Sequence, residues 1–225
     1  MALPSSASAH RALIVHAHPE PRSFSSAQAA VAAEQLRSRG VHVDLVDLYA
    51  EGWDPVVNVN DVENPTRPFK PQEATLQAIK DGTLNPEIAR HLELVLGADM
   101  LILSFPFWWF SMPAITKGWI DRVWVMGGVF GGDYGMLDEA ALYGKKALVA
   151  TTTGGPEEFY KPDEMTDDMH SFLSHIHHGI FRFVGYSTQE PIITYAPAHL
   201  PQEEREKALE HVYDTALRLN PEPSS

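Results

Sequence analysis

Cysteine is absent from the 225-residue sequence, which excludes disulfides, zinc ribbons and thiol catalysis. Basic residues are outnumbered: 17 Lys and Arg stand against 30 Asp and Glu, for a formal net charge of -13. Nucleic acids and anionic membranes bind basic surfaces, so we expect neither as a partner. Acidity alone identifies no substrate, and it is typical of a well-solvated surface.

Long apolar runs are also missing. None approaches the roughly 20 residues that a membrane span needs, and the N-terminal MALPSSASAHR lacks the apolar segment of a signal peptide. We therefore expect a cytoplasmic protein in which residues 1–10 form a flexible tail. The sequence contains no internal repeat, and its length allows one large domain or two small ones. The continuous order of strands and helices described below indicates a single domain over residues 1–225.

Several catalytic and cofactor motifs are missing as well. The sequence has no G-x-G-x-x-G, no P-loop lysine motif, no H-E-x-x-H and no G-x-S-x-G. It has 11 histidines, four of them in HSFLSHIHHG (170–179), but no acidic residue stands beside these at a metal-ligand spacing. We expect partly exposed histidines on a helix there, and no metal site.

Apolar runs that predict strands alternate with segments of helical periodicity. The order β-α-β-α-β-α-β-α-β-α is typical of a doubly wound α/β fold, a three-layer sandwich around five parallel strands. A proline-rich excursion at residues 54–85 interrupts the alternation. The expected strands are residues 11–17, 41–48, 98–105, 145–155 and 190–195, and the expected helices are residues 25–39, 86–96, 113–125, 166–184 and 201–219.

Three loops follow strands at the carboxyl edge of such a sheet, where ligands bind. The first, HAHPEPRSFSSA, places Ser23, Ser25 and Ser26 just before a helix, and His18 and Arg22 add positive charge. This pattern fits phosphate binding at a helix N-terminus, and it fits ordinary N-capping equally well.

The second loop, SFPFWWFSMP (104–113), carries bulk where loops usually carry small and polar residues. Adjacent residues point in different directions, so core packing does not account for both Trp108 and Trp109. A flat apolar ligand would suit these rings, with backbone groups bonding its polar edge. The third loop, TTTGG (151–155), either lets a ligand approach the backbone or makes a tight turn.

Together these segments identify a resemblance. The chain resembles the NAD(P)H:quinone oxidoreductases of the DT-diaphorase type, which have a flavodoxin-like fold. The resemblance covers nearly the whole chain and rests on ALIVHAHPE, SFS, DLYAEGWDPVV, FPFWWFSMPAITKGWIDRV, TTTGGPEEFY and EPIITY in the same order. It implies that the bound cofactor is FAD rather than FMN. It also implies that NADH or NADPH donates the hydride and that a quinone or similar aromatic molecule accepts it. It also implies a homodimer with each active site at the interface.

Site residues follow from the resemblance. The N–H groups of Gly154 and Gly155 and the Tyr160 hydroxyl are implied to stabilise negative charge on the reduced flavin. Trp109 and Phe110 are implied to line the substrate pocket, which Phe130 and Phe183 of the other subunit would cover. The implied flavin-binding residues are His18, Arg22, Ser23, Phe24 and Ser25, then Lys70, then Pro106, Phe107, Trp108, Trp109 and Phe110, then Thr152, Thr153, Gly154, Gly155 and Tyr160, and finally Arg205.

Two positions depart from the family pattern. The family histidine six residues after the tyrosine is replaced by Thr166, and His170 follows one helical turn later. The family's lid tyrosines are replaced by VFGGDYG (129–135), in which Phe130 keeps a ring without its hydroxyl and Tyr134 lies nearby. Substrate preference is therefore open among quinones and azo, nitro or flavin-type acceptors.

Two other functions stay open on the sequence. Some relatives are regulatory subunits that bind a potassium-efflux transporter, and an acidic surface does not decide against that role. A one-electron carrier of the flavodoxin kind is the other alternative. The excursion at residues 54–85 and the lack of a hydroxyl-rich phosphate loop count against it.

Overall fold

The computed structural model describes residues 10–162 and 167–218. Six strands form one parallel sheet in the order β2-β1-β3-β4, and both β5 and β6 pair with β4. This confirms the doubly wound α/β fold and the strand order of a flavodoxin-like sheet. The strands are β1 (Arg11–His16), β2 (His42–Asp47), β3 (Met100–Pro106), β4 (Lys146–Thr152), β5 (Ser187–Thr188) and β6 (Ile192–Thr194).

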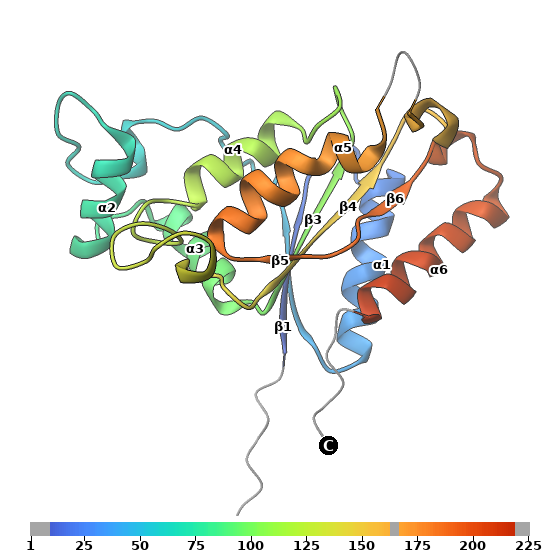
Figure 1. Cartoon of the computed structure of the whole chain (residues 1–225), viewed down its shortest axis with the longest axis horizontal. Coiled ribbons are helices and arrows are strands. Elements are labelled where there is room, and N and C mark those ends of the chain that lie inside the picture. The colour runs from blue at the N-terminus through green and yellow to red at the C-terminus, as the bar shows by residue number, and fades with distance from the viewer. Residues whose placement is uncertain (1–9, 163–166, 219–225) are drawn as a thin grey trace, which may run out of the picture.

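Helices cover both faces of the sheet, as Figure 1 shows: α1 and α6 lie on one face, and α3, α4 and α5 on the other. Because every crossover returns to the same edge, the carboxyl ends of β1, β3 and β4 meet at the top of this view. The helices are α1 (Phe24–Ser38), α2 (Pro71–Asp81), α3 (Pro86–Gly97), α4 (Ala114–Val123), α5 (Met169–Ser174) and α6 (Gln202–Arg218). No described helix is long and apolar enough to cross a membrane.

The central strands are buried on both sides, which explains their unbroken apolar runs. In β1, Ala12 and Ile14 belong to the core cluster that α1 completes, whereas Leu13 and Val15 belong to the cluster under α3 and α4. Successive side chains of a strand point to opposite faces, so one strand serves two cores. Such a strand holds the loop after it firmly in place.

Three expected elements differ from the observed ones. The expected fifth strand, 190–195, is replaced by two short pieces, β5 and β6, that pair with opposite halves of β4. The excursion at residues 54–85 contains the helix α2 and a short 3-10 helix at Val59–Asp61. The expected helix 166–184 is α5, then a π-helix (η4, His175–Phe181), then a 3-10 turn that ends at Gly185 with φ 98°. Glycine accepts that angle without steric cost.

A buried histidine on α3 joins α4 to the turn that follows β2. The His91 side chain is fully buried, and Trp119 Nε1 donates to its Nδ1 at 3.0 Å. An indole N–H can only donate, so Nδ1 accepts and the neutral ring carries its proton on Nε2, 3.0 Å from Glu51 Oε2. Burial lowers the His91 pKa from 6.5, helped by Arg90 and opposed by Glu51.

Stability is therefore expected to fall on acidification. Below about pH 6.5, His91 is protonated in the unfolded chain but stays neutral in the folded protein, because its folded pKa is lower. The free energy of unfolding therefore rises as the pH increases toward 6.5. Each such group contributes a slope of at most about 1.4 kcal/mol per pH unit. Urea unfolding at about pH 7.5 and 5.5 measures the slope. It should be shallower in His91→Gln and unchanged in His42→Gln, an exposed position; equal slopes in all three proteins would contradict this account.

Candidate functional site

Two adjoining cavities lie at the carboxyl edge of the sheet, and both are lined by His18 and Thr152. The first has a volume of about 560 Å³ and the second about 470 Å³. The three loops that the sequence singled out are brought together here. The first cavity is lined by His18, Pro106, Phe107, Trp108, Trp109, Thr152, Thr153 and Gly154. The second is lined by His18, Arg22, Ser23, Phe24, Ser25, Ala27, Thr152, Pro197, Ala198, Gln202, Arg205, Glu206 and Leu209.

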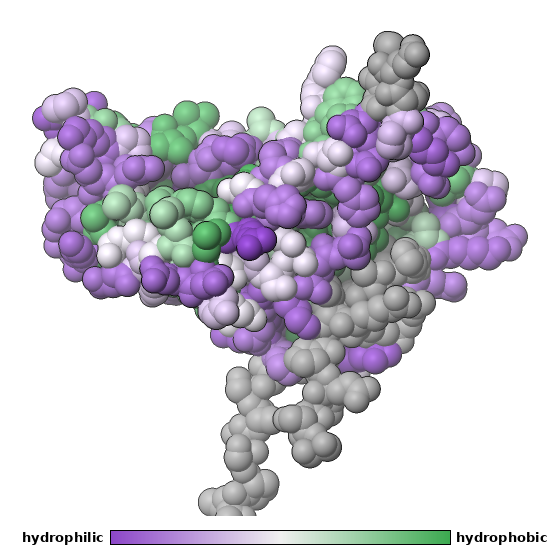
Figure 2. All heavy atoms as spheres, viewed as in Figure 1, coloured by the Kyte–Doolittle hydropathy of each residue, from purple (hydrophilic) through white to green (hydrophobic). Residues whose placement is uncertain are grey.

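The aromatic loop divides its rings between core and surface. Phe107 is buried, whereas Trp109 is 95% exposed. Figure 2 shows apolar surface at the top of the view, over the loop that follows β3. Trp108 and Ser111 exchange two backbone hydrogen bonds, of 3.0 and 3.1 Å, around a tight turn at Trp109 and Phe110. Phe107 N also donates to Thr152 O at 2.8 Å, which fixes this loop to the end of β4.

The first loop ends in a capped helix. Ser23 is the N-cap of α1, and its hydroxyl accepts from Ser26 N at 3.1 Å. The first N–H groups of a helix have no acceptor inside it, so those of Phe24 and Ser25 are left to a ligand. An anion placed beside them would also meet the positive end of the helix dipole. The loop therefore caps α1, and its geometry is also compatible with the expected phosphate site.

The side chain of Ser25 has a structural role. Ser25 is buried, and its hydroxyl bonds to that of Thr152 at 2.7 Å. This bond joins the start of α1 to the end of β4. Ser25 therefore offers a ligand its backbone N–H rather than its side chain. His18, by contrast, is half-buried, lines both cavities and has its ring 6.1 Å from that of Trp108.

The loop after β4 presents backbone to the first cavity. Thr153 Oγ1 donates to Gly155 O at 2.8 Å, which closes a turn over Gly154. A Cβ placed on Gly154 would meet no atom within 4 Å, so the space beside this cavity wall is open. A Cβ on Gly155 would lie 3.6 Å from the Tyr160 hydroxyl. Tyr160 therefore stands behind the turn, with its ring 6.0 Å from that of Phe107.

Comparisons with known proteins identify the family. A family model described as having a flavodoxin-like fold matches residues 10–218. NAD(P)H dehydrogenase (quinone) 1 of Rattus norvegicus is 38% identical over 205 residues, covering 89% of this chain and 74% of the rat protein. The chain belongs to the NAD(P)H:quinone oxidoreductase family. Human ribosyldihydronicotinamide dehydrogenase (quinone) is 38% identical over 199 residues, covering 87% and 85% of the two chains. The crystal structure of a candidate quinone reductase from Klebsiella pneumoniae matches with a TM-score of 0.85 and 33% identity, covering 92% of this chain and 83% of that one.

Six residues that the family resemblance assigned to the site line neither cavity. Phe110 and Tyr160 pack against Phe107, with ring distances of 6.2 and 6.0 Å, and Gly155 follows Gly154, so these three adjoin the first cavity.

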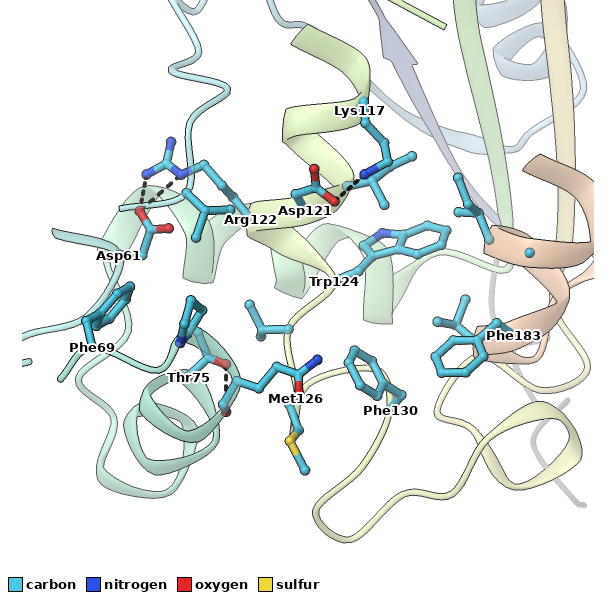
Figure 3. A pocket seen from close by; sticks show the side chains of 18 residues that line it. Asp61, Phe69, Thr75, Lys117, Asp121, Arg122, Trp124, Met126, Phe130 and Phe183 are labelled. Carbon is cyan, nitrogen blue, oxygen red and sulfur yellow. Dashed lines mark hydrogen bonds and ion pairs between the residues drawn. The ribbon is translucent and has the colours of Figure 1, made fainter. Parts of the chain in front are cut away.

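The other three residues lie farther away. Lys70 lines neither cavity and pairs with Glu73 at 2.8 Å on the surface of the excursion. Phe130 and Phe183 pack edge to face, 5.5 Å apart, in a separate cavity of about 290 Å³. Figure 3 shows this cavity between α4, the excursion and the chain around Phe130. Within one subunit, then, these rings do not cover the first cavity.

The departures from the family pattern are only partly visible. Thr166 lies outside the described residues. His170 is exposed on α5 and lines neither of the two cavities. Within residues 10–162 and 167–218, no cluster of three or more His, Cys, Asp and Glu side chains could hold a metal ion.

One buried residue near the first loop could not be identified from the sequence. His16 is 3% exposed, with Nδ1 3.1 Å from Ser104 Oγ and Nε2 3.0 Å from Ser26 Oγ. Ser26 Oγ in turn lies 2.9 Å from Ser23 Oγ. Burial lowers the His16 pKa, against the opposing charge of Asp47. In the sequence, His16 looks like one more residue of an apolar strand.

Proposed function

We propose that this family member is an FAD-dependent NAD(P)H:quinone oxidoreductase that works as a homodimer. The observation that carries the cofactor assignment is the second cavity. It begins at the N-terminus of α1, where a phosphate would bind, and it continues to Gln202 and Arg205 on α6. FMN ends at its phosphate. FAD continues through a pyrophosphate to an adenosine, which the second cavity has room to take.

The residues of the first cavity fit a flavin ring. The ring would lie across the loop after β3 and the Thr153–Gly155 turn, with backbone groups at its polar edge. A bound flavin would supply the two-electron chemistry by accepting a hydride from NAD(P)H and passing it to an acceptor. The protein's part is then to bind, orient and exclude water, which agrees with the absence of a strong acid–base motif.

The turn and the tyrosine behind it would stabilise charge. With the ring in the first cavity, the N–H groups of Gly154 and Gly155 and the Tyr160 hydroxyl would be the donors that stabilise negative charge on the reduced ring. Donor and acceptor would use the same face, beside Trp109 and Phe110. One face shared by both substrates implies that the first product leaves before the second substrate binds, which is a ping-pong order.

A second subunit would close this face. Phe130 and Phe183 line a separate cavity of their own subunit, so a role over the first cavity would have to be played across a dimer interface. Met136 and Leu137 are 57% and 48% exposed, and Figure 2 shows apolar surface in this part of the molecule. Exposed apolar surface is typical of subunit interfaces, and it supports the proposed dimer. The dimer would bring the two Phe side chains over the other subunit's aromatic loop.

The two alternative functions receive less support. The comparisons give none to a regulatory subunit of a potassium-efflux transporter, because the relatives described above are named as oxidoreductases. The first cavity, beside an exposed Trp109, would leave a second aromatic molecule access to the flavin, which a one-electron carrier does not need.

Purified protein is expected to be yellow, to release FAD on denaturation and to be bleached by NADPH or NADH without oxygen. The apoprotein should bind FAD at least about tenfold more tightly than FMN. Arg205→Ala should weaken FAD binding about tenfold and leave FMN binding nearly unchanged, because only FAD reaches α6. Titration of the apoprotein by flavin fluorescence measures both affinities.

The matched control is Lys207→Ala, two residues along the same helix, where the lysine pairs with Glu203 at 2.7 Å and lines neither cavity. It should bind both flavins as the wild type does. Tighter binding of FMN than of FAD would move the cofactor assignment to FMN. A colourless protein that takes up no flavin would contradict the proposed oxidoreductase activity.

A further inference from the structure

The turn beside the first cavity has an unfavourable backbone. Trp109 and Phe110, its two central residues, have φ values of 51° and 60°. Turns with positive φ at both central positions favour Asn-Gly and Gly-Gly, because a side chain with a Cβ crowds the backbone there. Two consecutive aromatic residues in this conformation need support from outside the turn. Part of that support comes from one helix segment.

His175 provides the first contact. Its Nε2 lies 2.9 Å from Ser111 Oγ, at the last position of the turn, and its Nδ1 lies 2.8 Å from Phe172 O. A carbonyl oxygen can only accept, so Nδ1 carries the proton and Nε2 accepts from the Ser111 hydroxyl. Both ring nitrogens are used, and the imidazole is a fixed bridge between the turn and the helix.

Phe172 provides the second contact from the same segment. Its ring lies 4.9 Å from that of Phe110, at an interplanar angle of 36°, and 6.1 Å from that of Phe107. His175 is also the first residue of the π-helix η4, immediately after α5. π-Helical turns are rare and occur mostly at functional sites. The break in the helix and the support of the turn therefore coincide at one residue.

We propose that His175 is a positioning residue: through Ser111 it holds the Trp109–Phe110 turn in its left-handed conformation and so places the backbone against which the flavin edge would lie. The role in cofactor binding rests on the proposed function, whereas the bridge to the turn does not. The other histidines of HSFLSHIHHG lack this contact. The His178 side chain in particular is exposed and makes no hydrogen bond to another described residue.

The experiment compares His175→Ala, His175→Gln and the control His178→Ala in the full-length protein. Hydrogen–deuterium exchange of the peptide covering residues 107–112 is read first, without flavin. His175→Ala should exchange the Trp108 and Ser111 amides about threefold to tenfold faster, the change expected from losing one hydrogen bond. His175→Gln keeps an acceptor near the position of Nε2 and should restore most of the protection. His178→Ala should exchange as the wild type does.

FAD affinity of the same proteins is read second. His175→Ala should bind FAD about threefold to tenfold more weakly, and the His175→Ala, Ser111→Ala double variant should be no worse than either single one, because both remove the same bond. Unchanged exchange in His175→Ala, or equal effects in His178→Ala, would overturn the proposal. If the wild type binds no flavin, the proposed function fails, and the exchange measurement still decides whether His175 holds the turn.

Discussion

Arg122→Ala is expected to lose about 3–5 kcal/mol of the free energy of unfolding. Arg122 and Asp61 are each only 4% exposed, and two guanidinium nitrogens of Arg122 donate to Asp61 Oδ1, at 3.1 and 2.7 Å. A third nitrogen donates to Asp54 O at 2.6 Å. Removing the arginine leaves a buried carboxylate without its partner, which costs far more than the pair itself contributes.

The size of this effect comes from what the arginine joins. Arg122 is on α4, and both of its partners belong to the excursion at residues 54–85, as Figure 3 shows for Asp61. The guanidinium also lies 4.9 Å from the Trp53 ring. Loss of Arg122 therefore detaches the excursion from the helix that follows the aromatic loop. The cavity that contains Phe130 and Phe183 is lined by Arg122 and should open as well.

Urea unfolding of the apoprotein measures the loss, and Lys117→Ala is the control. Lys117 lies on the same helix and pairs with Asp121 at 2.6 Å, but both side chains are about half exposed. Exposed pairs contribute at most about 1 kcal/mol, so this variant should be nearly as stable as the wild type. A loss of similar size in both variants would show that burial of the Arg122–Asp61 pair is not the cause.

The sheet and the place of the site could be predicted because both follow from local patterns. The runs LIV in β1 and LIL in β3 are typical of strands that are buried on both faces of a sheet. Parallel connections then force the loops after β1, β3 and β4 to one edge. The broken fifth strand could not be predicted, since EPIITY reads as one strand and Ser187–Thr188 carries no apolar signal.

Contacts between residues far apart in the sequence could not be predicted for a different reason. Arg122 and Asp61 are 61 positions apart, and neither stands in a pattern that marks burial. The same holds for Ser111 and His175, which are 64 positions apart. Ionised and hydrogen-bonding side chains are usually exposed, so a sequence alone predicts a solvated residue at each of these positions. Only the fold shows which of them pair.

Trp109→Gly is expected to make the apoprotein more stable than Trp109→Ala, by about 1 kcal/mol. Trp109 is 95% exposed, so removing its ring forfeits little packing in either variant. Its φ of 51° costs any residue with a Cβ about 1–2 kcal/mol, and glycine pays none of this cost. The usual order of the two residues is thereby reversed. At an exposed helix position such as Glu34, Ala should be the more stable by about 1 kcal/mol.

The order of the two variants in flavin affinity should be the reverse of their order in stability. Both variants lose the ring that would stand beside the flavin, which is expected to weaken FAD binding about two- to tenfold, the usual contribution of an aromatic contact. Trp109→Gly should be the weaker binder of the two, because a glycine lets the turn leave the conformation that presents its backbone. Thermal unfolding of the apoprotein and flavin titration give both quantities from one preparation. If Trp109→Ala proves the more stable and the better binder, the strained backbone at the turn does not account for flavin affinity. If glycine gains stability and loses affinity, an exposed tryptophan in a left-handed turn is explained by the ligand that lies against it.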